Sequence, residues 1–349
     1  GQTTIIDETA RQRATELLKF GGTPIGNSRV KLSNRDDCRK RGWIKDNETP
    51  FEVAASRIMA DQITVLHTIG GDDTNSAAAE LSEYLKNKGY GLHVIGLPKT
   101  IDNDIVPIHQ SLGALSAAEQ GALYFENIVS EYGASGRMLI IHEVMGRHCG
   151  WLTFATAKKY LERLKNRTFI PSLGLIREQR ALHGVFVPEL PIPLENEADR
   201  LRKTMETVGC VHLFVSEGAF INEIVQEMET RGPVSRDPFG HVKLDTVNTG
   251  QWVGDRLAPL LGAEKMLVQK SGYFARSAAA NGEDLRLIQS CVDFAVECAF
   301  RGQSGVIGHD EEHRNQLRCI EFSRIRGGKL FDVKHPEFLA LLKEIGQTY

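Results

Sequence analysis

The chain has 349 residues, more than the roughly 250–300 at which a single hydrophobic core usually divides, so we expect two domains. Its 42 Lys and Arg nearly balance its 45 Asp and Glu, and the formal net charge of −3 argues against a protein built mainly to bind nucleic acid. A hydrophobic content of 41% with 25% charged residues excludes a long disordered chain. The longest apolar runs fall far short of the ~20 residues that a membrane-crossing helix needs.

Six cysteines are scattered along the chain, at positions 38, 149, 210, 291, 298 and 319. None belongs to a Cys-x-x-Cys pair, and none has the spacing from histidine that a zinc finger requires. We therefore expect reduced, mostly buried thiols in a cytoplasmic protein. The sequence begins Gly-Gln-Thr-Thr, without a charged-then-apolar leader, so it does not predict secretion.

Five short and continuously apolar runs predict buried parallel strands, at residues 63–69, 92–97, 138–144, 211–215 and 266–268. Between them lie helix-period segments, of which 74–89 opens with capping residues and closes with Lys and Gly, and 281–302 carries an apolar stripe. This alternation predicts an α/β fold with a mostly parallel sheet. We interpret residues 161–180, which lack clean periodicity, and the proline-rich 188–193 as surface insertions or linkers.

Ligands of open α/β sheets bind beyond the carboxyl ends of the strands, so the residues that follow each apolar run are the candidate site. The first run ends in Gly70-Gly71-Asp72-Asp73-Thr74. Two glycines let the backbone approach a phosphate, the following helix offers free N–H groups, and Asp72 could hold a Mg²⁺ ion. The alternative is that Asp73 and Thr74 only cap the helix.

The second run leads into Thr100-Ile-Asp-Asn-Asp104. Three acidic or amide side chains in a row favour a metal-and-phosphate site, in which one carboxylate accepts a proton from a substrate hydroxyl. The alternative is an Asx-type turn. Four histidines lie inside apolar runs and are interpreted as core or sheet residues rather than metal ligands, namely His67, His93, His142 and His212.

Four motifs in this order resemble the phosphofructokinase family: Gly70-Gly-Asp-Asp-Thr, Pro98-Lys-Thr-Ile-Asp-Asn-Asp104, Glu143-Val-Met-Gly-Arg147 and Ser216-Glu-Gly218. The resemblance runs from about residue 21 to the end and includes a Gly-Gly-Thr…Ser-Arg29 segment. It implies two Rossmann-like α/β lobes with mostly parallel sheets. Residues 1–113 with 276–325 would bind the phosphoryl donor, and residues 114–275 with 326–349 would bind fructose 6-phosphate.

The same resemblance implies Mg²⁺-dependent phosphoryl transfer to the 1-hydroxyl of fructose 6-phosphate, with Asp102 as general base and Asp72 as metal ligand. Asp104 would support the metal and the base, and Arg29 would neutralise the phosphoryl charge. Thr100 and Arg147 would contact the sugar and the transferring group. The donor phosphate loop would be Gly70, Gly71 and Thr74, and the sugar phosphate would be lined by Met145, Gly146, Glu217, Lys270, Tyr273 and Arg276.

Two positions indicate the phosphoryl donor. Asp73 and Lys99 stand where the ATP-using branch of the family usually has glycine. A carboxylate at 73 would repel the α-phosphate of ATP, and an ammonium at 99 would balance the charge of pyrophosphate. The pair resembles the pyrophosphate-dependent branch and predicts a reversible reaction. The alternatives are an ATP-dependent enzyme, a non-catalytic subunit and a sugar-phosphate binding module.

Two departures from the family pattern are visible. The family's first strand and Gly-rich phosphate loop, which precede the Gly-Gly-Thr segment, have no counterpart in this sequence. Met138 stands where the family usually has an Arg that reaches a neighbouring subunit's sugar phosphate, and Arg137 lies one residue earlier. A homodimer or homotetramer is still expected from the resemblance.

Overall fold

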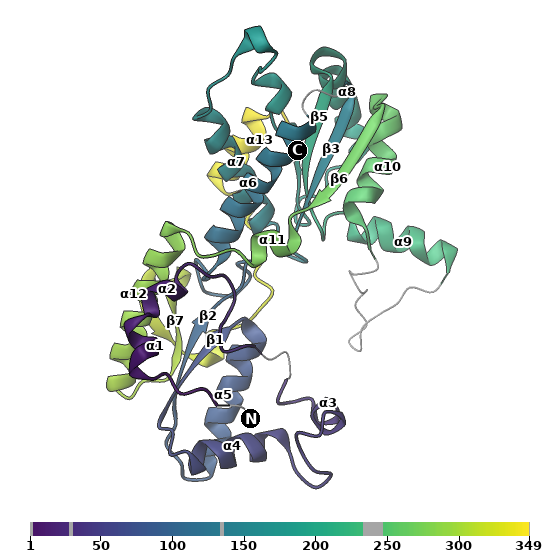
Figure 1. Ribbon diagram of the computed structural model, residues 1–349. Coiled ribbons are helices and arrows are strands. Elements are labelled where there is room, and N and C mark those ends of the chain that lie inside the picture. The colour runs from purple at the N-terminus through teal and green to yellow at the C-terminus, as the bar shows by residue number, and fades with distance from the viewer. Residues whose placement is uncertain (1–2, 28–30, 133–135, 233–246, 349) are drawn as a thin grey trace. The chain divides into compact units, whose positions relative to one another are not determined.

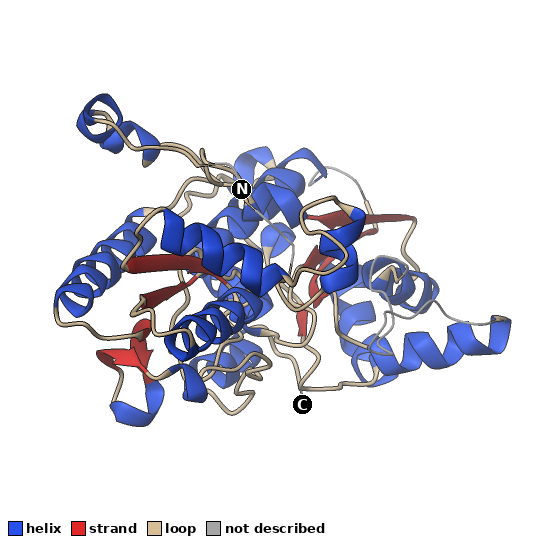
Figure 2. Ribbon diagram, turned by 90° about the horizontal axis from the view of Figure 1, so that it is seen from below, coloured by secondary structure: helices blue, strands red, loops and turns tan. Residues whose placement is uncertain are grey.

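Two α/β units make up the chain, and each is formed by two separate stretches of sequence. Unit 1 comprises Gly1–Ala114 and Ala279–Lys329, and unit 2 comprises Leu115–Ala278 and Leu330–Tyr349. This computed structural model describes residues 3–27, 31–132, 136–232 and 247–348. Helices and loops surround the short strands of the sheets (Figure 2).

Unit 1 is built on a four-stranded sheet in the order β1-β2-β7-β8. Its strands are β1 (Val65–Gly70), β2 (His93–Pro98), β7 (Gly305–Asp310) and β8 (Gln316–Ile320). The first three are parallel, and β8 runs antiparallel to β7. Successive side chains of a strand point to opposite faces. Val94 therefore packs with α4 (Pro50–Ala60) and α5 (Asp72–Asn87), whereas Ile95 packs with α12 (Gly282–Phe300) (Figure 1).

Unit 2 contains a parallel sheet in the order β4-β5-β3-β6. Its strands are β3 (Met138–Val144), β4 (Gly184–Phe186), β5 (Cys210–Ser216) and β6 (Lys265–Lys270). One core contains Phe125, Phe214 and Phe338 and joins the sheet to α6 (Ala114–Tyr132), α7 (Trp151–Lys165) and α13 (Pro336–Glu344). A second core on the other face joins it to α8 (Leu194–Val208) and α10 (Thr249–Leu261) (Figure 1).

The remaining elements are short. The α-helices among them are α1 (Glu8–Gln12), α2 (Ala14–Leu17), α3 (Arg35–Lys40), α9 (Ile221–Arg231) and α11 (Gly272–Arg276). The 3-10 helices are Pro171–Leu173, Glu178–Arg180, Glu311–His313 and Phe322–Arg324. No helix in the described ranges has the length and apolar character needed to cross a membrane.

The predicted α/β class with mostly parallel sheets is confirmed, and the five predicted strands correspond to β1, β2, β3, β5 and β6. Strands β4, β7 and β8 were not predicted. The interpretation of residues 161–180 and 188–193 as surface insertions is wrong in part. Leu161 and Leu164 continue α7 into the first core of unit 2, and Ile192 is buried in its second core.

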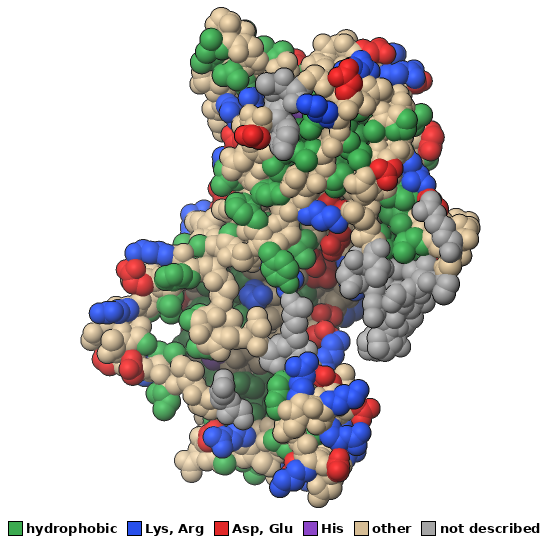
Figure 3. Space-filling model, turned by 45° about the vertical axis from the view of Figure 1, so that its right-hand side comes forward, with side chains coloured by type: hydrophobic (Ala, Val, Ile, Leu, Met, Phe, Trp, Pro, Cys, Tyr) green, Lys and Arg blue, Asp and Glu red, His purple; other side chains and the backbone are tan. Residues whose placement is uncertain are grey.

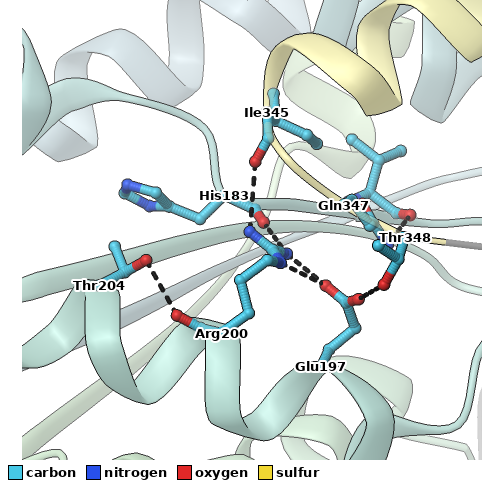
Figure 4. Close-up of polar contacts among 8 residues, drawn as sticks. His183, Glu197, Arg200, Thr204, Ile345, Gln347 and Thr348 are labelled. Carbon is cyan, nitrogen blue, oxygen red and sulfur yellow. Dashed lines mark hydrogen bonds and ion pairs between the residues drawn. The ribbon is translucent and has the colours of Figure 1, made fainter.

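The C-terminal segment is fixed to unit 2 by polar contacts (Figure 4). The buried Gln347 amide accepts a hydrogen bond from Val185 N (2.7 Å) and donates one to Val185 O (3.1 Å), as a neighbouring strand would. Thr348 donates to the buried carboxylate of Glu197, which is paired with Arg200. These bonds satisfy polar groups of β4 and α8 that would otherwise be buried alone.

The mixture of charges on the surface and the burial of the cysteines agree with what the sequence predicts. Lys, Arg, Asp and Glu side chains are interspersed over the face drawn in Figure 3, in agreement with the small net charge of the chain. All six cysteines are free thiols; Cys319 is half-buried and the other five are buried.

Candidate active site

The loops after β1 and β2 begin side by side in unit 1. Gly70 and Pro98 are register partners in these two parallel strands, and Lys99 N donates to Gly70 O over 2.8 Å. The Gly-Gly-Asp-Asp-Thr loop and the loop that contains Asp102 therefore start from one edge of one sheet. This is the edge at which open parallel sheets bind ligands.

The first loop turns sharply into α5 and requires glycine at position 70. The Thr74 side chain lies over Gly70, where an added Cβ would be only 2.3 Å from Thr74 Oγ1. Gly71 is the N-cap of α5, and the buried Asn75 amide donates to Gly71 O (3.0 Å). Asp72 occupies the first turn of α5, and its carboxylate lies against Gly327. The helix N-terminus and the close backbone suit an anion at this loop.

Asp73 has a basic partner that the sequence analysis did not identify. Lys31 Nζ lies 2.8 Å from Asp73 Oδ1, and both side chains are about half exposed. A cation at this position offsets the charge of Asp73 at the start of α5. The motifs do not predict this role for Lys31, because it precedes Asp73 by 42 positions in the sequence.

The second loop is held by hydrogen bonds among its own residues. Thr100 Oγ1 accepts from Asp102 N (3.2 Å) and donates to Asp104 Oδ1 (3.4 Å). Lys329 N donates to Asp104 O (2.9 Å), which ties the loop to the last residue of unit 1. Asp102 and Asp104 are half-buried, whereas Asn103 between them is buried. The loop therefore contains a Thr-based turn, and that turn holds its carboxylate residues together.

The carboxylates of these two loops fit a Mg²⁺ ion that arrives with a phosphate. In the part of the chain that the structure describes, no three His, Cys, Asp or Glu side chains are close enough to form a metal cage. Mg²⁺ commonly needs only one or two carboxylates and takes its other oxygens from water and substrate phosphates. Asp72, Asp102 and Asp104 supply carboxylate oxygens at the ends of β1 and β2.

In unit 2, the loops after β3 and β5 interlock. Ser216 Oγ donates to Gly146 O (2.7 Å), and Gly146 N donates to Glu217 Oε1 (3.2 Å). Gly218 must be glycine, because an added Cβ would lie 1.8 Å from Arg147 O. Burial raises the pKa of the Glu217 carboxyl, and the nearby negative charge of Glu143 raises it further. The two loops thus form one hydrogen-bonded turn that carries the Glu217 carboxyl.

Glu143 connects this turn to β6. Its carboxylate lies 2.7 Å from Lys270 Nζ and accepts a hydrogen bond from Gly250 N (2.7 Å) at the start of α10. Residues 143 and 270 are register partners on the parallel strands β3 and β6. Glu143 belongs to the Glu143-Val-Met-Gly-Arg147 motif, in which the family resemblance implies no role for it. Its place at the end of a buried apolar strand was the available signal.

The predicted sugar-phosphate residues of unit 2 follow three strands of one sheet. Met145 and Gly146 follow β3, and Glu217 follows β5. Lys270 ends β6, and α11 carries Tyr273 and Arg276. The Arg276 guanidinium lies 5.8 Å from the centre of the Tyr273 ring. Because β3 lies between β5 and β6, the ends of these strands place these side chains along one sheet edge.

A family model described as Phosphofructokinase matches residues 2–290. The chain belongs to the phosphofructokinase family. A curated relative from Methylotuvimicrobium alcaliphilum named "Pyrophosphate--fructose 6-phosphate 1-phosphotransferase" is 58% identical over 349 residues, covering 100% of this chain and 85% of the relative. A relative of the same name from Mastigamoeba balamuthi is 56% identical over 348 residues, covering 99% of this chain and 85% of the relative.

A solved structure shows the same fold. The pyrophosphate-dependent phosphofructokinase from Nitrosospira multiformis matches with a TM-score of 0.67 at 18% identity, covering 97% of this chain and 77% of that one. The fold and the family predicted from the four motifs are therefore confirmed.

The role of Arg29 at the donor stays a prediction, because Arg29 lies outside the described residues. Arg137 caps the end of α10 by donating to Gly262 O (2.6 Å) and Leu261 O (3.0 Å), and Met138 is buried in the core.

The four histidines also differ from one another. The ring of His212 bonds to a backbone carbonyl, but both ring nitrogens of His142 are buried without a hydrogen-bond partner among the described residues. His142 is a core residue, as predicted. His67 is exposed, so its interpretation as a core or sheet residue holds only for its place in β1.

Proposed function

We propose that this member of the phosphofructokinase family transfers a phosphoryl group from pyrophosphate to the 1-hydroxyl of fructose 6-phosphate. The products are fructose 1,6-bisphosphate and phosphate, and the reaction is reversible and serves glycolysis or gluconeogenesis. The names of the two relatives that are 58% and 56% identical support this function. The structural observation that carries it is the shared sheet edge of the Asp73 and Asp102 loops.

The donor assignment depends on charge at the end of β1 and β2. The negative charge of Asp73 disfavours binding of the α-phosphate of ATP. Lys31 forms an ion pair with the Asp73 carboxylate and so prevents that carboxylate from repelling every anion. Lys99, which directly follows β2, supplies a positive charge for the pyrophosphate. Gly70, Gly71 and Thr74 form the turn whose backbone N–H groups donate hydrogen bonds to the donor phosphates.

The chemical step needs one proton transfer. Asp102 accepts the proton of the 1-hydroxyl as the sugar oxygen forms its bond to phosphorus, and the bond to the leaving phosphate breaks. The Thr100 hydroxyl oxygen accepts a hydrogen bond from the backbone N–H of Asp102 and so holds that residue. Arg147 and Lys99 offset the negative charge of the transferring group. A Mg²⁺ ion held by Asp72 and Asp104 would neutralise phosphate oxygens.

The two units have different substrates in this proposal. Unit 1 binds pyrophosphate and Mg²⁺, and unit 2 binds fructose 6-phosphate through Arg147, Glu217, Lys270 and Arg276. Arg29 contributes charge at the donor. The working form is a homodimer or homotetramer in the cytoplasm, where the six free thiols stay reduced.

The donor is tested by measuring fructose 1,6-bisphosphate formation from fructose 6-phosphate and Mg²⁺, with pyrophosphate and ATP in parallel. We expect turnover with pyrophosphate and none with ATP. The double change Asp73→Gly with Lys99→Gly should reduce kcat/KM for pyrophosphate at least about 100-fold, because the positive charge that Lys99 supplies to the donor phosphates is lost. Turnover with ATP alone would show that the two positions do not select the donor.

The base is tested with Asp102→Asn. We expect kcat to fall about 100- to 10,000-fold, with KM for fructose 6-phosphate nearly unchanged, because the carboxylate acts only in the transition state. Asp199→Asn is the matched control, since Asp199 lies on the exposed face of α8, and it should have wild-type rates. A large rise in KM with normal kcat would exclude Asp102 as the base.

A further inference from the structure

Asn103, which lies between Asp102 and Asp104, has an unusual backbone conformation. Its φ is +53°, in the left-handed region that few residues other than glycine adopt without strain. Its side chain is buried, with 2% exposed. A polar residue that is both buried and left-handed is expected where the surrounding structure demands that particular turn.

All the polar atoms of the Asn103 amide have partners in the same loop. Asn103 Oδ1 accepts a hydrogen bond from Ser111 N (2.7 Å) and lies 3.0 Å from Ser111 Oγ, whose single proton is shared between Asn103 Oδ1 and Thr100 O. Asn103 Nδ2 donates to His109 O (3.1 Å). Three hydrogen bonds therefore join the middle of the Asp102 loop to the segment that closes it.

Ser111 completes the connection. Its hydroxyl also lies 2.7 Å from Thr100 O, at the start of the loop, and the side chain is buried. The loop is thus held at its first residue, at Asn103 and at its closing segment by one hydrogen-bonded cluster, in which the buried side chains of Asn103 and Ser111 bond to the backbone oxygens of His109 and Thr100. The two carboxylate residues flank the central member of this cluster.

We propose that Asn103 is a positioning residue that fixes the direction of the Asp102 carboxylate for proton transfer. The inference rests on the proposed function, in which Asp102 is the base. Asn103 touches neither substrate nor the reacting atoms; it acts by holding the left-handed turn from which Asp102 projects. A displacement of about 1 Å in a catalytic group can cost ~100-fold in rate, so the loss of this turn has a kinetic consequence.

The first variant is Asn103→Gly, because glycine adopts φ above zero freely and removes only the amide and its three hydrogen bonds. We expect kcat with pyrophosphate to fall about 10- to 100-fold, while KM for both substrates changes less than about 3-fold. Asn103→Asp keeps the oxygen that Ser111 contacts and tolerates the same conformation, so it should recover part of the lost kcat. Ser111→Ala removes the hydroxyl contacts to Asn103 Oδ1 and Thr100 O but keeps the bonds from Ser111 N and to His109 O, so it should give a smaller loss.

The decisive measurement combines Asn103→Gly with Asp102→Asn. If Asn103 acts through Asp102, its substitution lowers kcat in the wild-type background and has no further effect once the carboxylate is gone. An equal loss in both backgrounds would show a merely structural role and would overturn the proposal, as would a wild-type kcat for Asn103→Gly. If Asn103→Gly fails to fold, Ser111→Ala is placed in the same two backgrounds and decides by the same criterion.

Failure of the proposed function has a different signature. If Asp102→Asn alone retains the wild-type kcat, the base is misassigned and the positioning proposal falls with it. If Asp102→Asn is inactive and Asn103→Gly is fully active, the proposed function stands and only the role of Asn103 is wrong.

Discussion

Asp73 shows how one side chain can serve two opposing electrostatic requirements. Its carboxylate lies at the turn proposed to bind pyrophosphate, where a negative charge would exclude ATP but would also weaken binding of the proposed donor. The ion pair with Lys31 resolves this conflict in part, since the ammonium lies 2.8 Å from Asp73 Oδ1. The pair is about half exposed, so screening by solvent limits its effect.

Substitution of Lys31 tests this balance. Lys31→Met should raise KM for pyrophosphate about 3- to 5-fold, the effect of a partly exposed ion pair, with little change in KM for fructose 6-phosphate. The change Asp73→Asn in the same chain should reverse most of that rise, because the uncompensated carboxylate is then absent. Steady-state kinetics at low and high salt would measure both effects. A rise that Asp73→Asn does not reverse would mean that Lys31 acts on the donor directly.

At the level of single residues, the sequence predicted side chains that lie directly after apolar strands and missed those that reach the site from elsewhere. Asp72, Asp102 and Glu217 were predictable because each follows a recognisable strand end. Lys31 was not, because only the folded chain brings it to Asp73. Asn103 was visible as part of a motif, but its left-handed backbone and its three hydrogen bonds are tertiary features.

At the level of elements, the accuracy of the strand predictions follows burial and length. Strands β3 and β5 are buried along all seven residues and read as continuous apolar runs. The missed strands lack that signal: β4 has three residues, and β8 is a five-residue antiparallel edge strand in which the polar Gln316 and Arg318 alternate with Leu317 and Cys319. Strand β7 contains Gly, His and Asp, whose burial depends on neighbours distant in sequence.

Helix prediction was limited by charge on exposed faces. The predicted ends of α5 lie within two residues of the observed ones, although its N-cap is Gly71 and not a side-chain capping residue, and Asn281 caps α12 as expected. In α7, the Lys, Arg and Glu side chains of its last two turns obscured an apolar stripe that includes Leu161 and Leu164. A stripe of this kind is recognisable only when the sheet that it covers is known.

At the scale of the whole molecule, the second unit concentrates buried neutral imidazoles. Burial lowers the pKa of His142 to about 3, that of His183 to about 3 and that of His212 to about 4. His142 stacks on Phe125, with the ring centres 5.5 Å apart, and its ring nitrogens have no partner among the described residues. Such groups are more easily protonated in the unfolded chain, where the pKa of His is about 6.5.

This difference makes folding of unit 2 sensitive to acid. The neutral form is stabilised by folding, so the contribution is fully present above about pH 6.5 and is lost as the pH falls toward the folded-state pKa. For His142 alone, the free energy of unfolding should fall by about 2 kcal/mol between pH 6.5 and pH 5. His142→Phe keeps the aromatic contacts and removes the titrating group, so denaturant unfolding should show that much less pH dependence. His67→Gln, on an exposed position of β1, is the control and should follow the wild type. An unchanged pH dependence in His142→Phe would mean that the imidazole is protonated equally in the folded and unfolded chains.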